Sequence, residues 1–194
     1  IAVLKEHFPG EQRISLVPKH VEKLVKKGMA VLIEKGLGET IHYDDAAFEK
    51  VGAEIVSNRE LLLSRADVVV RLRKPPVEDI ALMKQGALNV SFLDPFNNHS
   101  LLEAFSKHSV DAFCMELVPR STRAQKMDAL SSQASLGGYV AVMLAAERFD
   151  KILPMMMTPA GTISPSRVFV IGAGVAGLQA IATAKRMGAR VDAF

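Results

Sequence analysis

The sequence predicts an α/β protein built on parallel sheets, and three observations support this fold class. Short apolar runs alternate with amphipathic helical patterns over roughly the first 118 residues, as in a sheet with crossover helices. Continuous apolar runs such as Val68 to Val70 are typical of strands buried on both faces. A strand, a glycine-rich turn, a helix and another strand then follow from Arg167.

The elements of the first domain can be placed in order. Strands are expected in the apolar runs 1–4, 31–34, 54–56, 67–73, 87–93 and 110–117. Helices are expected between them, in 18–27, 43–53, 58–66, 77–86 and 100–108. This order predicts a flavodoxin-like or Rossmann-like parallel sheet, which binds ligands at the ends of its strands.

Composition and charge narrow the class of protein. With 49% hydrophobic and 23% charged residues, the chain can bury a core. Its 24 basic and 21 acidic residues are scattered, so nucleic acid is not predicted as a partner. No secretory pattern and no apolar run of membrane-span length is seen, so this chain is expected to be soluble, although it could belong to a larger membrane assembly.

Metal and nucleophilic chemistry find no support in the sequence. The histidines lack zinc-ligand spacing, and Cys114, alone in an apolar run, is expected to be a buried thiol. There is no G-x-S-x-G elbow and no P-loop. No metal site is therefore predicted. The histidines are His7, His20, His42, His99 and His108.

The alternation breaks after residue 118. A polar stretch leads into a long helical pattern interrupted by Gly137 and Gly138, which implies a close backbone approach or a late start of the helix. Residues 151–166, rich in proline and methionine, are expected to form a loop. One face of the helix is expected to combine Leu136, Tyr139, Val140, Met143 and Ala146.

Gly172, Gly174 and Gly177 form G-x-G-x-x-G between a strand and a helix. The first glycine permits the tight turn, the second lets a diphosphate approach the backbone, and the third lets helix and strand pack closely. The free N–H groups of Val175 and Ala176 and the helix dipole would then face the phosphates. This context predicts dinucleotide binding, the alternative being a tight turn without a ligand.

The domain organisation follows from these patterns. We expect an N-terminal α/β domain at 1–130, and a linking helix with the beginning of a Rossmann domain at 131–194. Gly188 is placed to cap the last helix. Asp192 stands near the position of the ribose-binding acid, but no residue is assigned the choice of NAD over NADP. With its Rossmann domain only begun, residues 1–194 alone are expected to bind NADH weakly.

The stretch PRSTRAQKMDALSSQ, residues 119–133, concentrates polar side chains after an expected strand. Arginine, glutamine, serine and aspartate together can hold a flat carboxamide from both sides, as nicotinamide requires. On composition alone, a solvated interdomain loop explains the stretch equally well.

This stretch closely resembles the signature of the NAD(H)-binding component (alpha subunit, domain I) of proton-translocating NAD(P) transhydrogenases. The resemblance extends to KEHFPGEQRISLVP at the start and to MMMTPAGTISPSRVFVIGAGVAGLQAIATAKRMGA near the end. It implies that Arg120, Gln125, Asp128 and Ser131 surround the nicotinamide and orient it. Ser121 and Thr122 depart from the family pattern, which usually has a β-branched apolar residue and then serine or threonine.

The resemblance further implies NAD as cofactor and hydride transfer between NAD(H) and NADP(H). Such transfer needs alignment of two rings and no general acid or base. It also implies a homodimer, an NADP(H)-binding partner and a membrane proton-channel partner. The location would be cytoplasmic and peripheral to a bacterial inner membrane, with the mitochondrial matrix face less favoured.

Two alternatives remain. The first is an alanine dehydrogenase, in which Arg13 and Arg73 could bind a substrate carboxylate, but Asp94 stands where that family carries a histidine. The second is a non-catalytic nucleotide-binding module, which the α/β scaffold alone would allow.

Overall fold

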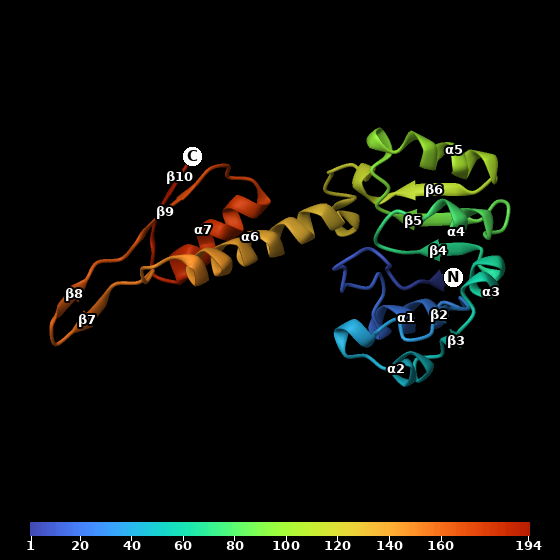
Figure 1. The fold of residues 1–194 in the computed structure, drawn as a ribbon, viewed down its shortest axis with the longest axis horizontal. Helices are drawn as coiled ribbons and strands as arrows, with labels where there is room; N and C mark the ends of the chain where they lie inside the picture. The colour runs from blue at the N-terminus through green and yellow to red at the C-terminus, as the bar shows by residue number, and fades with distance from the viewer. The chain divides into compact units, whose positions relative to one another are not determined.

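The computed structural model describes residues 1–194, which form two compact units, Ile1–Val118 and Pro119–Phe194 (Figure 1). The first unit contains a six-stranded sheet in the order β3-β2-β1-β4-β5-β6, in which every pairing is parallel. The predicted parallel α/β fold is confirmed. The strands are β1 (Ala2–Val3), β2 (Leu32–Glu34), β3 (Glu54–Val56), β4 (Val68–Val70), β5 (Leu88–Ser91) and β6 (Asp111–Cys114).

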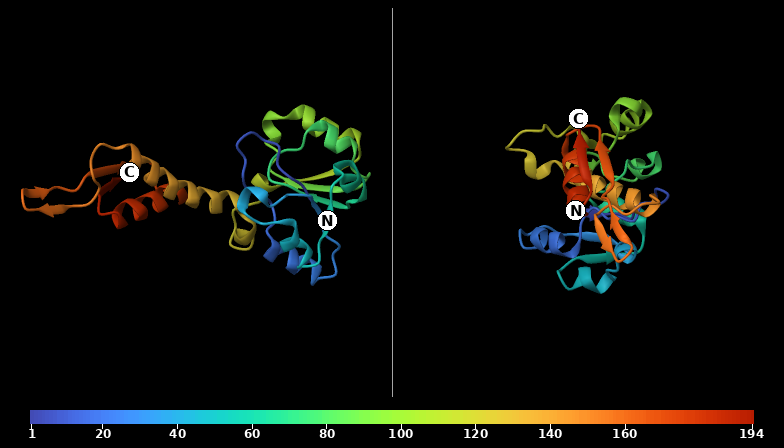
Figure 2. Two further views of the ribbon diagram at one scale, coloured as in Figure 1. Left: turned by 60° about the horizontal axis from the view of Figure 1, so that its bottom comes forward. Right: turned by 90° about the vertical axis from the view of Figure 1, so that its left-hand side faces the viewer.

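Helices cover both faces of this sheet (Figure 2). Side chains alternate between the two faces along a strand, so Ala2 of β1 belongs to one buried core and Val3 to another on the opposite face. Each core needs its own layer of helices. Helices α3, α4 and α5 close the first core, and α1 and α2 close the second. The helices are α1 (Pro18–Val25), α2 (Asp45–Glu49), α3 (Arg59–Arg65), α4 (Val77–Ala81) and α5 (His99–Lys107), with short 3-10 turns η1 (Glu39–Ile41), η2 (Pro95–Asn97) and η3 (Met115–Leu117).

A chain of charged side chains is buried at one edge of the first core. Arg59 donates to Glu34 Oε2 at 2.6 Å and to both carboxylate oxygens of Asp79, at 3.1 and 2.7 Å. Arg71 donates to Asp79 Oδ2 at 2.8 Å, and the Arg71 and Asp79 side chains are only 3% and 8% exposed. Burial alone would raise the pKa of Asp79, but the hydrogen bonds and charges of Arg59 and Arg71 hold it below its usual value.

The second unit contains the strand, turn, helix and strand that the sequence predicts from Arg167. Strands β9 and β10 pair in parallel, with α7 as the crossover, and Gly188 ends α7 with a φ of +85°. One expectation is wrong, because 151–166 is not all loop: β7 and β8 form an exposed antiparallel hairpin within it. The elements are η4 (Gln125–Met127), α6 (Ala129–Arg148), β7 (Met156–Thr158), β8 (Gly161–Ile163), β9 (Arg167–Val170), α7 (Val175–Arg186) and β10 (Arg190–Ala193).

Helices α6 and α7 lie side by side, and a glycine makes this contact possible (Figures 1 and 2). A β-carbon at Gly138 would lie 2.1 Å from the carbonyl oxygen of Ala176. Of the two explanations considered for the paired glycines, close approach is therefore right, and the helix starts early, at Ala129. The face expected from periodicity is largely exposed, whereas the buried residues of α6 are Gly138 and Val142.

The two adjacent glycines should respond oppositely to alanine. Gly138→Ala is expected to lower the free energy of unfolding by about 1–3 kcal/mol, because the methyl group meets fixed backbone. Gly137 has no atom within 4 Å of a β-carbon, so Gly137→Ala should raise it by about 0.5–1 kcal/mol through helix propensity. Urea denaturation followed by far-UV circular dichroism measures both. Equal effects would contradict the packing described for α6.

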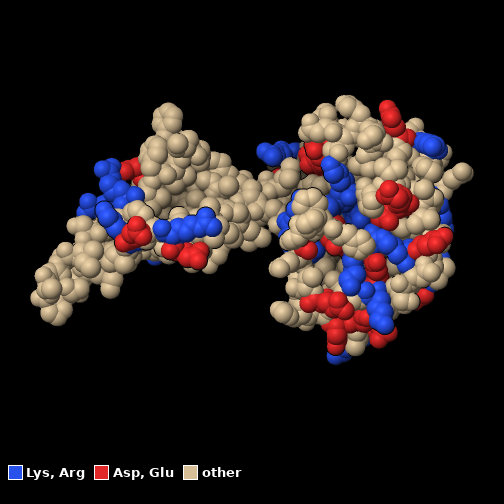
Figure 3. Space-filling view, in the orientation of Figure 1, with Lys and Arg blue, Asp and Glu red and all other residues tan.

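Helix α6 also carries an unusually apolar surface. It has 20 residues and is apolar enough to cross a membrane by length and composition, contrary to the expectation that no such stretch exists. Core helices of soluble proteins meet the same criterion. Figure 3 shows that charged side chains are dense over the first unit and scarce along α6. In this structure only 11% of that apolar stretch of α6 is buried.

Candidate functional site

The glycine-rich turn between β9 and α7 has the geometry that each of its glycines requires. Gly172 has a φ of +95°, which a residue with a side chain rarely adopts. A β-carbon at Gly177 would lie 1.7 Å from the carbonyl oxygen of Gly172, so only glycine fits there. Gly174 faces open space, with no atom within 4 Å of a β-carbon. The open position is the one where the motif brings a diphosphate close to the backbone.

The N-terminus of α7 is free to receive an anion. Gly174 occupies the cap position, and no side chain caps the helix. The first N–H groups, those of Val175 and Ala176, have no carbonyl partner within the helix, and the helix dipole adds partial positive charge there. These residues fit the phosphates of a dinucleotide.

The polar stretch that starts at Pro119 belongs to the same compact unit as this turn. Gln125 begins the 3-10 helix η4, and Asp128 caps α6. The Asp128 carboxylate accepts from the Ser131 backbone N–H at 2.9 Å and from the Ser131 hydroxyl at 2.6 Å. These two hydrogen bonds, with the charge of Arg120, hold the pKa of Asp128 below its usual value. Asp128 is thus an ionised acceptor at neutral pH.

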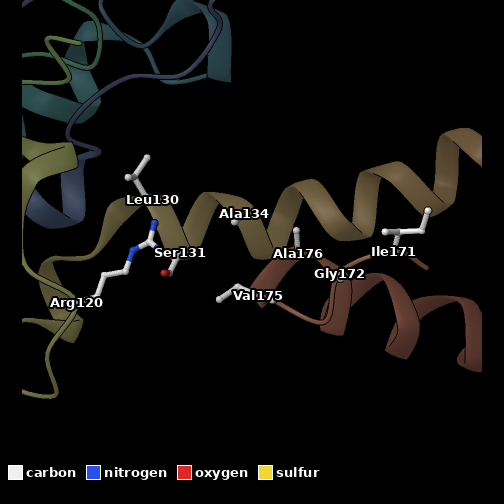
Figure 4. Close-up of a pocket in the computed structure, with 10 residues that line it drawn as sticks. Arg120, Leu130, Ser131, Ala134, Ile171, Gly172, Val175 and Ala176 are labelled. Carbon is white, nitrogen blue, oxygen red and sulfur yellow. The ribbon is translucent and has the colours of Figure 1, made fainter. Parts of the chain in front are cut away.

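The polar stretch lines two cavities, one of which also contains the glycine turn. One, of about 250 Å³, is lined by Arg120, Ser121, Thr122, Gln125, Asp128 and Ser131. The other, of about 490 Å³, is lined by Arg120 and Ser131 together with Gly172, Gly174, Val175, Ala176 and Gly177. Arg120 and Ser131 line both, and Figure 4 shows the Arg120 side chain lying beside Ser131, with Val175 and Ala176 at the start of α7. The structure therefore places Arg120 and Ser131 beside the glycine turn, whereas Gln125 and Asp128 line only the smaller cavity.

Sequence reasoning missed an apolar wall in the larger cavity. Leu130, Ala134 and Ile171 line it beside the polar groups. Ala134 is four residues after Leu130 and three after Ser131 on α6, so its side chain lies between those of the two along the helix surface. That spacing was visible in the sequence, but only the packing of α6 on α7 places these residues at a site. Such a mixed lining suits a flat, partly apolar ring.

The residues weighed for an amino-acid substrate lie in the first unit. Arg13 and Arg73 both donate to the carboxylate of Glu11. Asp94 has a φ of +50° and accepts from the side chains of Asn97 and Asn98, at 2.8 and 3.0 Å. No trio of His, Cys, Asp or Glu side chains is placed to hold a metal ion.

Asp192 and Cys114, both singled out in the sequence, have local partners. Asp192 pairs with Arg167 at 2.7 Å across β9 and β10. Cys114 is half-buried, and its burial, with the neighbouring Glu116, raises the pKa of its thiol to about 11. It is therefore protonated and unreactive at neutral pH.

Comparison with models of known protein families identifies the family of this chain. The family model for the alanine dehydrogenase/PNT N-terminal domain matches residues 2–137, and the model for the alanine dehydrogenase/PNT C-terminal domain matches residues 141–194. The chain belongs to the alanine dehydrogenase/PNT family. The sequence-based resemblance to its transhydrogenase branch is confirmed by the individual relatives that follow.

The curated relatives and solved structures favour one branch of this family. The chain is 47% identical over 198 residues to an NAD(P) transhydrogenase subunit alpha chain of Rhodospirillum rubrum, covering 100% of this chain and 52% of the relative. A transhydrogenase structure from Sinorhizobium meliloti is 44% identical, with a TM-score of 0.93 over 99% of this chain and 55% of that one. An L-alanine dehydrogenase structure is 25% identical, with a TM-score of 0.88, covering 100% of this chain and 54% of that one. The chain thus spans about half the length of the Rhodospirillum rubrum relative.

Proposed function

We propose that this alanine dehydrogenase/PNT family chain belongs to the NAD(H)-binding component of an NAD(P) transhydrogenase, which exchanges hydride between NAD(H) and NADP(H). One observation carries the proposal: Arg120 and Ser131 line the same cavity as the glycine turn. A diphosphate held at that turn would leave its nicotinamide within reach of the polar stretch. The identity of 47% to a transhydrogenase subunit supports the same function.

The polar residues would position the ring and do no chemistry on it. Bound NADH supplies the hydride. The Arg120 guanidinium and the Gln125 amide can donate to the carboxamide oxygen, and the Asp128 carboxylate can accept from the carboxamide nitrogen. Ser131 holds Asp128 in place through two hydrogen bonds. Since hydride transfer is a matter of alignment, these contacts would set the rate.

Cofactor choice, assembly and location belong to the same proposal. We assign NAD rather than NADP to this chain, with an NADP(H)-binding component and a membrane proton-translocating component as partners, and a homodimer as its own assembly. The site would lie on the cytoplasmic side of a bacterial inner membrane. The domain division proposed for this chain is 1–130 and 131–194.

Alanine dehydrogenase activity is less favoured, because Arg13 and Arg73 already bind Glu11.

Gln125→Asn in the full-length protein tests the proposal. It should slow hydride exchange with an NADP-loaded partner by about 10–100-fold while changing the Kd of NADH by less than about threefold, because the shorter side chain misplaces the ring. Stopped-flow exchange and NADH fluorescence titration measure the two effects. Gln85→Asn, on the exposed surface of the first unit, is the matched control and should change neither.

Asp128→Ser separates a structural role from a role in positioning. Serine can still cap α6, so helicity and folding should be retained, but the carboxylate is lost. A slower exchange with unchanged far-UV circular dichroism is expected. If Gln125→Asn and Asp128→Ser lower the rate and the NADH affinity equally, these side chains merely anchor the cofactor and the positioning role is wrong.

A further inference from the structure

Helix α1, on the outer surface of the first unit (Figure 1), borders a groove of about 500 Å³. Two half-buried leucines supply its apolar floor, Leu16 just before the helix and Leu24 in its last turn. Both also pack against the second core, so the floor is held in place. The groove is lined by Leu16, His20, Lys23, Leu24, Lys26 and Lys27.

The rim of this groove is basic. His20, Lys23 and Lys27 are spaced three and four residues apart, so they lie along one side of the helix, and all three are exposed. No acidic side chain lines the groove. Lysine keeps its ammonium group in water while its methylene groups lie along apolar surface. The groove therefore combines an apolar floor with a ring of positive charge.

Most of this positive charge is not neutralised by the protein. Lys26 forms an ion pair with Glu22 at 2.5 Å, within the same helix. Lys23 and Lys27 have no carboxylate partner. Their ammonium groups are available to carboxylates brought by another molecule, and charge complementarity of this kind favours an acidic partner.

The end of α1 is an ordered turn. The Met29 N–H donates to the carbonyl oxygen of Leu24 at 3.2 Å, and the Gly28 N–H donates to that of Val25 at 2.9 Å. Gly28 has a φ of +81°, which completes a helix-ending turn with this pair of hydrogen bonds. The backbone that carries Lys27 is therefore fixed before any partner binds, which reduces the entropy lost on binding.

The shape of the groove favours a peptide over a membrane or a second copy of the chain. Surfaces that bind membranes present apolar side chains that enter the bilayer, whereas Leu16 and Leu24 lie half-buried below exposed lysines. A flat bilayer would meet the ammonium groups and leave the floor unfilled. A symmetric contact between two copies would bring two basic grooves together, in a chain whose net charge is already +3.

We propose that this groove docks an acidic segment of a partner protein. One apolar side chain of that segment would lie on Leu16 and Leu24, and carboxylates on either side of it would pair with Lys23 and Lys27. The inference concerns only the surface of α1 and does not depend on the proposed function.

A model peptide tests the chemistry of the groove. The full-length protein is titrated into a fluorescein-labelled peptide in which one leucine is flanked on each side by three glutamates, and fluorescence anisotropy is measured. Binding should be saturable and should weaken as sodium chloride is added. Replacing the leucine of the peptide with serine should weaken binding by about fivefold, because the floor is left unfilled.

Charge reversal on the protein makes the result specific. Lys23→Glu combined with Lys27→Glu should weaken binding of the leucine peptide by at least about tenfold. Lys107→Glu combined with Lys151→Glu gives the same change in net charge at two exposed positions outside α1 and should change the affinity by less than about twofold. Far-UV circular dichroism checks that each variant folds, and Lys23→Gln with Lys27→Gln, a milder change, should weaken binding in the same direction.

Three results would overturn the proposal. The native protein would show no saturable binding, the serine peptide would bind as tightly as the leucine peptide, or the control variant would lose as much affinity as the α1 variant. Vesicles of phosphatidylserine and phosphatidylcholine are tested by sedimentation in parallel. Vesicle binding that requires Lys23 and Lys27, without peptide binding, would assign the groove to a membrane surface instead.

Discussion

Gly177→Ala in the full-length protein is expected to weaken NADH binding by at least about 100-fold, or about 2.8 kcal/mol. The added β-carbon would lie 1.7 Å from the carbonyl oxygen of Gly172 and 2.9 Å from its carbonyl carbon. Neither atom can move without opening the turn, so the N–H groups at the start of α7 would no longer point at a common diphosphate. NADH fluorescence titration measures the loss.

Gly174→Ala separates an effect on NADH binding from an effect on stability. No atom lies within 4 Å of a β-carbon at Gly174, and its φ of −76° is ordinary for alanine. The free energy of unfolding should therefore change little, while NADH binding should weaken by about tenfold or more, because the methyl group enters the space proposed for the diphosphate. Gly137→Ala, with equal free space but far from the turn in sequence, should leave NADH binding intact. Unchanged binding in Gly174→Ala would place the diphosphate elsewhere.

Asp79→Ala is expected to lower the free energy of unfolding by about 3–5 kcal/mol. The loss would leave Arg71 buried without its carboxylate and Arg59 with Glu34 alone. Urea denaturation at neutral pH measures this change. Asp67→Ala removes an exposed carboxylate from its pair with Lys84 and serves as control, with little effect expected.

The same network predicts how stability depends on pH. Asp79 has a pKa below its unfolded value of 3.8, so its contribution is present above that value and is lost as pH falls toward the lower folded pKa. Asp79→Asn removes this titration and should lose less stability than the native protein as pH falls below about 4. An equally steep acid loss in both proteins would mean that Asp79 is not held ionised by its arginines.

The first unit could be predicted almost entirely from sequence because its signals are local. Each strand is a short apolar run, and each helix has a repeating apolar face, so their order alone specifies a parallel sheet. The glycine turn was equally local, since three glycines within six residues leave few other conformations. Both predictions depended on neighbours in the chain.

What could not be predicted depends on contacts between distant residues. Glu11 gave no signal, because its partner Arg73 is 62 residues away and carboxylates on loops are usually solvated. Periodicity predicted the apolar residues that share one face of α6, but that face is largely exposed, and Gly138 and Val142 are the buried residues. The position of Asp128 just before an apolar run is typical of a helix N-cap, a role that the sequence analysis did not assign. The family resemblance instead suggested that Asp128 surrounds the nicotinamide.

A structure of the full-length protein with bound NADH tests the central claim most directly. The account predicts the diphosphate at the N–H groups of Val175 and Ala176, and the nicotinamide carboxamide within about 3.2 Å of polar atoms of Arg120, Gln125 or Asp128. A nicotinamide ring bound away from all three of these side chains would contradict it.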